Sequence, residues 1–182
     1  MARIIVLGRF QPFHSGHAFL LSQARKLGGE LVVAIGSSEA DESMENPWSA
    51  EERVEMIQAW AQSTDCQVTT VCIPDIHDPP HWVGHATEFH GHGVLATSDD
   101  TTAELYRDAG WEVAEILMNE RQQFVGWRVR QTLTMLSTIG DDDAFTAVMS
   151  ESLPQSTIEW FLADEYRLFR LSELGPDIDA IG

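Results

Sequence analysis

The chain has 182 residues, enough for one domain with a sizeable buried core. Its formal net charge of −18 argues against a general nucleic-acid binder, which would carry a basic surface. The sequence has no apolar run as long as a membrane span and no basic segment leading into one, so we expect a soluble, cytoplasmic protein without a membrane partner.

Strand and helix patterns alternate along the chain. Short apolar runs predict strands at residues 3–7, 31–35, 67–73, 93–96 and 111–116. Helical periodicity and caps predict helices at residues 16–27, from the capping box 49–52 onward, at 82–89, 101–109 and 126–137, and from 152 to about 168. This order predicts an α/β fold, a doubly wound parallel sheet. Residues 1–182 are expected to form one domain, with 141–182 as its helical C-terminal extension.

The most specific segment, residues 8–17, reads Gly-Arg-Phe-Gln-Pro-Phe-His-Ser-Gly-His and lies between the first strand and the first helix. A helix N-terminus favours anions, and Arg9 can form a fork of hydrogen bonds to phosphate oxygens. His14 and His17 share one face of the first helical turn, and Gly16 leaves the backbone open to a ligand. Either histidine alone could be an ordinary surface residue or a metal ligand. The whole segment predicts a phosphate site.

The short pattern H-x-G-H resembles the signature of the nucleotidylyltransferase superfamily. The longer string resembles the archaeal-type nicotinamide-nucleotide adenylyltransferases. This resemblance implies a Rossmann-like nucleotidylyltransferase fold and transfer of the adenylyl group of ATP to nicotinamide mononucleotide (NMN), giving NAD and pyrophosphate. It also implies Mg²⁺ carried by ATP rather than held by a protein metal site, and a homo-oligomer, often a hexamer.

The resemblance also implies roles for single residues. His14 and His17 would contact the ATP phosphates, with His17 stabilising the transition state, and Arg9 would bind phosphate. The expected catalytic residues are Arg9, His14, His17 and Arg130, the expected ATP-binding residues are Gly8, Arg9, Phe10, His14, Gly16, His17, Gly126, Val129 and Arg130, and the expected acceptor-binding residues are Ser37, Asp75, Ile76 and Trp82.

A second block, residues 45–53, resembles the family segment E-N-P-F-[ST]-A-x-E-R, with Trp48 in place of Phe. Ser49 and Glu52 fit a capping box, which is a structural role. Arg53 lies in the first helical turn, where a positive charge opposes the helix dipole. Two interpretations stay open: Arg53 pairs with a nearby acid, or it reaches toward the substrate.

A third block, Pro74-Asp75-Ile76 followed by Trp82-Val83, is similar to the family's D-I-x5-W-V segment. There the aspartate-isoleucine turn offers hydrogen bonds to the carboxamide, and the tryptophan stacks on the nicotinamide ring. A flat cationic ring suits an aromatic face. Residues 74–80 are expected to form a loop, stiffened by Pro79-Pro80 where the family has an asparagine. Together with the Gln11-Pro12 pair, this block favours the nicotinamide substrate.

A fourth block, residues 124–130, aligns with the family's Y-S-G-T-E-[IV]-R. Gly126, Val129 and Arg130 match, whereas Val125 and Trp127 replace the hydroxyl residues that would donate to phosphate oxygens. These replacements keep two alternatives open. One is a related transferase with another phosphate acceptor, such as phosphopantetheine or glycerol phosphate. The other is a catalytically weak protein that binds NAD or a nucleotide.

Two further groups of residues have simpler interpretations. The histidines at positions 77, 81, 85, 90 and 92 suggest a metal site, but we favour exposed or packing side chains because no carboxylate or cysteine follows at ligand spacing. Cys66 and Cys72 have neither metal-ligand spacing nor a secretory context and are expected to be reduced thiols.

Overall fold

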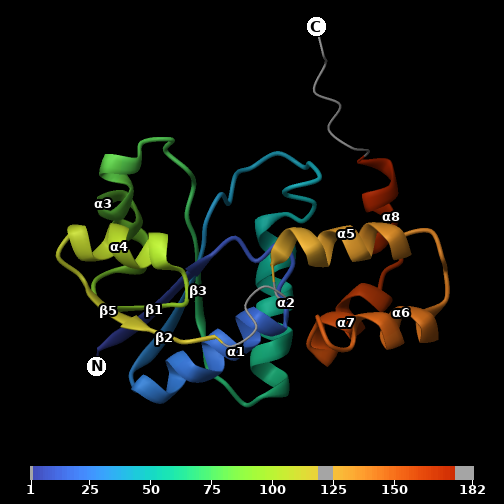
Figure 1. Ribbon diagram of the computed structural model, residues 1–182, viewed down its shortest axis with the longest axis horizontal. Helices are drawn as coiled ribbons and strands as arrows, with labels where there is room; N and C mark the ends of the chain where they lie inside the picture. The colour runs from blue at the N-terminus through green and yellow to red at the C-terminus, as the bar shows by residue number, and fades with distance from the viewer. Residues whose placement is uncertain (1, 119–124, 175–182) are drawn as a thin grey trace, which may run out of the picture.

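The computed structural model describes residues 2–118 and 125–174. Its centre is a parallel sheet in the order β3-β2-β1-β4-β5 (Figure 1). The strands are β1 (Arg3–Gly8), β2 (Glu30–Ile35), β3 (Thr69–Cys72), β4 (Val94–Thr97) and β5 (Glu112–Glu115). The predicted doubly wound parallel sheet is therefore confirmed, with every expected strand present in the described part of the chain.

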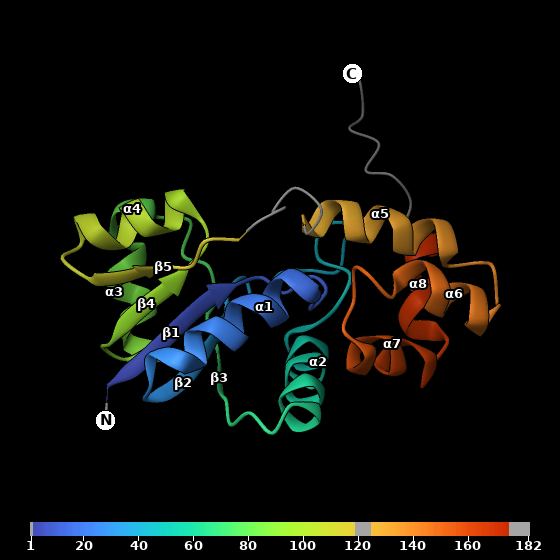
Figure 2. The same ribbon diagram turned by 60° about the horizontal axis from the view of Figure 1, so that its bottom comes forward.

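Helices cover both faces of the sheet (Figures 1 and 2). They are α1 (Ser15–Ala24), a 3-10 turn η1 (Arg25–Leu27), α2 (Ala50–Ser63), α3 (Pro79–His90), α4 (Asp100–Asp108), α5 (Gly126–Leu136), α6 (Asp142–Met149), α7 (Gln155–Leu162) and α8 (Tyr166–Glu173). The predicted capping box of α2 is present, with Ser49 and Glu52 bonding reciprocally.

Alternate residues of β1 divide the core into two parts. Ile5 faces one cluster with Val83 of α3 and Tyr106 of α4. Ile4 and Val6 face a larger cluster that includes side chains of α1, α2 and α5 to α8. Because side chains point alternately to the two faces of a strand, one apolar run can serve both layers.

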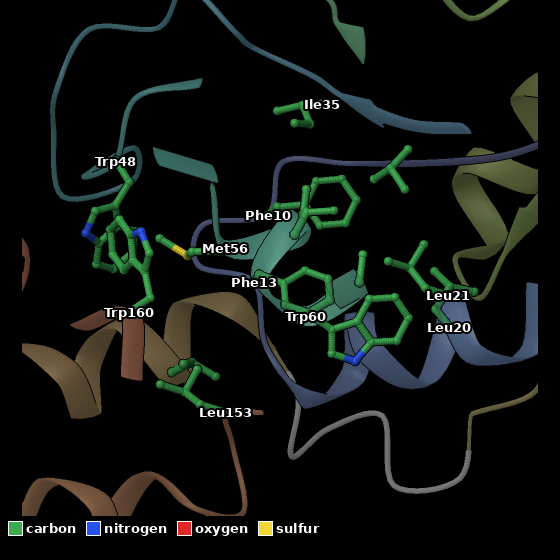
Figure 3. Packing of buried hydrophobic residues seen from close by; sticks show 14 of the residues in the cluster. Phe10, Phe13, Leu20, Leu21, Ile35, Trp48, Met56, Trp60, Leu153 and Trp160 are labelled. Atoms are coloured by element: carbon green, nitrogen blue, oxygen red, sulfur yellow. The ribbon is translucent and has the colours of Figure 1, made fainter. Parts of the chain in front are cut away.

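The large cluster also anchors the segment that follows β1. Phe10 is 1% exposed and Phe13 is 0% exposed. Figure 3 shows both rings in the core, and the ring of Phe13 lies 5.6 Å from that of Trp60 on α2. Burial of two phenylalanine rings contributes several kcal/mol, so this loop is fixed by the core rather than by a ligand.

Helices α5 to α8 gather on the side of α2, away from α3 and α4 (Figure 2). The single helix expected from residue 152 to about 168 is wrong, because α7 ends at Leu162 and α8 begins at Tyr166. The carboxylate of Asp164 accepts a bond from the backbone N–H of Tyr166 at 3.0 Å. This short polar turn redirects the chain although the amphipathic pattern continues through it.

Candidate functional site

The switch point of the sheet lies between β1 and β4. The chain passes from β1 outward to β2 and β3, then returns to add β4 and β5 on the other side of β1. In such sheets the carboxyl ends of the strands at the switch point form a crevice in which ligands bind. The loop after β1, which holds the H-x-G-H segment, opens at this crevice.

His14 and His17 cap helix α1 reciprocally. The backbone N–H of His17 donates to Nδ1 of His14, and the backbone N–H of His14 donates to Nδ1 of His17, both at 3.3 Å. The two rings stack with centroids 3.6 Å apart. Since Nδ1 of each ring accepts a hydrogen bond, the neutral imidazoles carry their proton on Nε2 and present it as a donor.

Both rings are held uncharged. Burial lowers the pKa of His14 to about 4, with a further contribution from the Arg130 guanidinium. Burial and the adjacent His14 ring lower the pKa of His17 well below its ordinary value. An arriving phosphate would stabilise a proton on this stacked pair, because an opposite charge nearby favours the charged form.

The low pKa of His14 predicts a loss of stability in acid. Its folded-state pKa of about 4 lies below the ordinary value of 6.5, so the unfolded chain takes up the proton first. The stabilisation is complete above pH 6.5 and is lost as the pH falls toward 4. From pH 7 to pH 4 this one group should lower the free energy of unfolding by about 3 kcal/mol.

Urea unfolding of the wild type and of His14→Asn, at pH 7 and at pH 4, measures this effect. Asparagine can still accept the N–H of His17 but does not titrate. Acidification should therefore cost the wild type about 3 kcal/mol more than the variant. An equal loss in both proteins would contradict the account.

A cleft of about 250 Å³ lies against these histidines, and we call it the histidine cleft. It is lined by residues of α1, of the ends of β1 and β4, and of the start of α5: Leu7, His14, Gly16, His17, Leu20, Thr97, Ser98, Asp99, Met118, Val125 and Gly126. The expected ATP-binding residues His14, Gly16, His17 and Gly126 thus lie together. Phe10 and Val129 belong instead to the buried core.

The start of α5 approaches the motif closely. Nη1 of Arg130 donates to the carbonyl of Gln11 at 2.7 Å, and burial lowers the pKa of this guanidinium. A Cβ at Gly126 would lie 3.3 Å from the same Nη1, so glycine lets helix and loop meet. Val125 stands at the N-cap without a side-chain hydrogen bond, as its replacement of a hydroxyl residue predicts.

A second cleft, of about 560 Å³, lies on the other side of the end of β1, and we call it the acceptor cleft. Its lining comes from the loops after β1, β2 and β3 and from α3 and α4: Leu7, Gly8, Arg9, Gly36, Ser37, Asp75, His77, Asp78, Pro79, Trp82, Thr102 and Leu105. Gly8, Arg9, Ser37, Asp75 and Trp82 therefore lie together. Ile76 is 36% exposed and is not part of this lining.

Backbone strain is concentrated around the two clefts. Of the four non-glycine residues with positive φ in the described chain, three belong to these loops: Phe10 (54°), Ser37 (47°) and His77 (50°). Such conformations cost about 1 kcal/mol or more each and persist where surrounding structure enforces them.

Arg53 is the residue whose position departs most from expectation. It is 1% exposed, and the hydrogen bonds of its guanidinium go to backbone carbonyls rather than to an acid. The interpretation that it reaches toward the substrate stays a prediction. Its guanidinium donates to the backbone carbonyls of Ser49 (3.1 Å), Arg9 (2.9 Å), Gly36 (2.9 Å) and Ser37 (3.1 Å). Arg53 thus joins the loops after β1 and β2, whose residues Arg9, Gly36 and Ser37 line the acceptor cleft.

Gln11, like Arg53, has a structural role, because its side chain bonds to backbone groups. Its side-chain amide donates to the carbonyl of Trp48 at 2.7 Å and accepts the Trp48 N–H at 3.1 Å. The Trp48 indole in turn donates to the carbonyl of Arg167 in α8. The side chain of Gln11 is therefore occupied by the protein backbone and is 3% exposed, although the sequence suggested a link to the substrate.

Arg170 completes the connection to the last helix, and no motif in the sequence indicates this role. Its guanidinium donates to both carboxylate oxygens of Glu52, at 2.8 and 2.7 Å, and to the carbonyl of Pro47 at 3.1 Å. Glu52 also accepts the N–H of Ser49. The segment 45–53 is thereby fixed between the motif loop and α8.

The region of α3 corrects one expectation. Pro79 and Pro80 do not lie in a loop; they form the first two positions of α3, where a missing N–H costs little. His81 contacts Asp78, His85 bonds to the carbonyl of Pro74, and His90 bonds to the Tyr106 hydroxyl. Residues 2–118 and 125–174 contain no group of three His, Cys, Asp or Glu side chains arranged to hold a metal ion.

Two further observations concern the described residues. Both cysteines are free, with Cys72 exposed. None of the helices in this part of the chain is both long and apolar enough to cross a membrane. Phe124, the first residue of the fourth block, lies outside the described residues.

Residues 5–133 match the model of the cytidylyltransferase-like family. The nicotinamide-nucleotide adenylyltransferase of Pyrobaculum neutrophilum is 32% identical over 137 residues, which cover 73% of this chain and 77% of that protein. The protein of the same description from Methanoculleus marisnigri is 30% identical over 134 residues, covering 73% and 80%. That of Archaeoglobus fulgidus is 30% identical over 138 residues, covering 72% and 79%.

Two solved structures share the fold. Both are bifunctional NMN adenylyltransferase/ADP-ribose pyrophosphatases from Francisella tularensis, one of them complexed with AMP and a manganese ion. The complex has a TM-score of 0.62 at 22% identity over 74% of this chain, and the other structure has 0.68 at 18% over 93%. The match spans only 42% and 53% of those longer chains. The chain belongs to the cytidylyltransferase-like family and, within it, to the group of archaeal nicotinamide-nucleotide adenylyltransferases.

Proposed function

We propose that this protein transfers the adenylyl group of ATP to NMN, releasing NAD and pyrophosphate. The observation that carries the proposal is the pair of clefts that meet at the end of β1, where Leu7 lines both. One cleft presents His14 and His17, and the other presents Arg9 and Trp82. Two anionic substrates could therefore bind on either side of one strand end with their phosphates adjoining.

The chemistry needs no protein nucleophile. A phosphate oxygen of NMN attacks the α-phosphorus of ATP, the new P–O bond forms, and the bond to the bridging oxygen of pyrophosphate breaks. Negative charge accumulates on the phosphate oxygens in the transition state. We assign its stabilisation to the Nε2–H groups of His14 and His17, whose rings are held by the reciprocal cap of α1 and line the histidine cleft.

We propose different roles for Arg9 and Arg130 in the transfer reaction. Arg9 is exposed in the acceptor cleft and is free to bind the phosphate of NMN. Arg130 is 9% exposed and is bonded to the loop through Gln11. We infer that its charge acts on the ATP phosphates while its hydrogen bond positions the loop.

ATP is expected to enter as its Mg²⁺ complex, in which the metal neutralises charge on the phosphates. The described lining of the histidine cleft contains one carboxylate, that of Asp99. This lining suits a metal coordinated mainly by the nucleotide. The bifunctional enzyme of similar fold from Francisella tularensis was crystallised with AMP and a manganese ion.

The acceptor is proposed from the names of the archaeal relatives together with the acceptor cleft. Trp82 offers an aromatic face to the cationic nicotinamide ring. Asp75 accepts the N–H of His77 at 2.9 Å, which fixes the turn expected to meet the carboxamide.

We also propose that residues 1–182 form one domain, because α6 to α8 share the large core cluster with the sheet. Residues 175–182 of the expected extension lie outside the described residues. The homo-oligomer implied by the family resemblance stays a prediction.

An acceptor panel tests the proposed function. The protein is incubated with ATP and Mg²⁺ together with NMN, phosphopantetheine or glycerol phosphate, and pyrophosphate release is measured. We expect release with NMN and no release above background with the other two. Release with phosphopantetheine or glycerol phosphate but not with NMN would assign the chain to a related transferase instead.

A further inference from the structure

The acceptor cleft is closed at one end by the N-terminus of α3. Asp78, Pro79 and Trp82 all line the cleft there. A helix N-terminus is ordinarily a ready anion site, because its first backbone N–H groups are unpaired and the helix dipole is positive. Here Pro79 and Pro80 occupy the first two helical positions and carry no N–H. Two of the donors that would receive an anion are therefore missing.

Asp78 changes this end of the cleft further. It stands at the N-cap of α3, where an aspartate usually accepts a backbone N–H of the first turn, but it makes no such bond. Its carboxylate instead contacts Nδ1 of His81 at 2.8 Å and is 48% exposed. The carboxylate thus adds a negative charge at the cleft, and no backbone N–H of the first turn of α3 donates to it.

Charge is distributed unequally along the cleft. At the α3 end its lining contains the carboxylates of Asp75 and Asp78 and the imidazole of His77, whose Nδ1 lies 3.9 Å from Asp75. Beside the end of β1 it contains one Arg or Lys side chain, Arg9. The N–H of Asp75 is bonded to a third carboxylate, that of Glu39, at 2.9 Å. The phosphate of a mononucleotide is attracted to Arg9, and a second anion at the far end would meet these carboxylates.

We propose that Asp78 and the Pro79-Pro80 pair make the acceptor cleft select the amide of NMN against the carboxylate of nicotinate mononucleotide. This inference rests on the proposed function and names the form of its acceptor. A neutral carboxamide can donate its N–H groups to carboxylates, whereas a carboxylate is repelled by them and finds two prolines in place of N–H donors. Selectivity that depends on a repulsive element is a common way to discriminate between ligands of equal size.

The test compares kcat/KM for the two mononucleotides at saturating Mg²⁺ and ATP. The assays with both mononucleotides are run at the same pH. Four proteins are measured: the wild type, Asp78→Asn, the double variant Asp78→Asn/Pro80→Ala, and the control Asp143→Asn. Asparagine keeps a good N-cap residue while removing the charge, and alanine restores one N–H. Asp143 is an exposed residue of α6 outside the lining of either cleft.

We expect the wild type to prefer NMN. Asp78→Asn should reduce the ratio of kcat/KM for NMN to kcat/KM for nicotinate mononucleotide about tenfold. The double variant should reduce this ratio further, chiefly through a lower KM for nicotinate mononucleotide. Asp143→Asn should leave the ratio unchanged. Thermal melts of all four proteins show whether a variant has lost its fold.

Three outcomes would overturn the inference. Equal use of both mononucleotides by the wild type would refute the selectivity, although the proposed function would stand. A ratio that stays constant in folded Asp78→Asn and in the double variant would remove Asp78 and the prolines from it. Failure of the wild type to use NMN while other acceptors react would refute the proposed function, and this inference with it.

Discussion

Replacing His17 by asparagine is expected to lower kcat for NAD formation by about 100- to 1000-fold, the usual loss when one preorganised donor to a transition-state anion is removed. The side-chain oxygen of asparagine can still accept the N–H of His14, so the cap of α1 is kept while the Nε2–H donor is lost. A decrease in kcat of this size would therefore result from loss of the Nε2–H donor rather than from loss of the helix cap.

The matched control is His92→Asn, which makes the same substitution at an exposed histidine that packs on Trp111 outside both clefts. Steady-state kinetics of the wild type and the two variants, with melting curves, complete the comparison. If folded His17→Asn kept kcat within about threefold of the wild type, His17 would have no part in transition-state stabilisation.

Replacing Arg53 by methionine is expected to lower the free energy of unfolding by about 3–5 kcal/mol, because several buried carbonyls lose their donor at once. The guanidinium serves four carbonyl groups and is 1% exposed. Lysine at the same position should recover only part of the loss, since one ammonium cannot reproduce the planar fork.

Urea unfolding curves of Arg53→Met, Arg53→Lys and the exposed control Arg25→Met measure the difference. The control should change stability by no more than about 0.5 kcal/mol. If Arg53→Met behaved like the control, the four hydrogen bonds would not hold the two loops, and the shape of the acceptor cleft would need another cause.

Most of the sheet could be predicted from local patterns in the sequence. The run Ile4-Ile5-Val6-Leu7 lies between two helical layers, so it is apolar on both faces and could be recognised without knowing its neighbours. The break between α7 and α8 could not be recognised in this way. One short turn at Asp164 redirects the chain without interrupting the apolar periodicity.

The residues of the site likewise fall into two groups, those predictable from local sequence and those whose roles depend on distant contacts. His14, Gly16 and His17 lie within one four-residue segment of the chain, and their joint position follows from one strand-to-helix turn. The roles of Arg53 and Gln11 depend on which distant carbonyls lie unpaired beside them. Backbone carbonyls are the same at every position in a sequence, so only the folded structure reveals that these side chains position the loops.

If ATP and NMN react across the end of β1, NAD and pyrophosphate must form together, and both can be quantified in one reaction mixture. The protein, ATP, Mg²⁺ and NMN are combined, and the same mixture is prepared with His17→Asn. We expect equimolar NAD and pyrophosphate from the wild type and a collapse of both products in the variant. A folded wild type that binds ATP and NMN but forms no NAD would contradict the account and identify a nucleotide-binding protein without this activity.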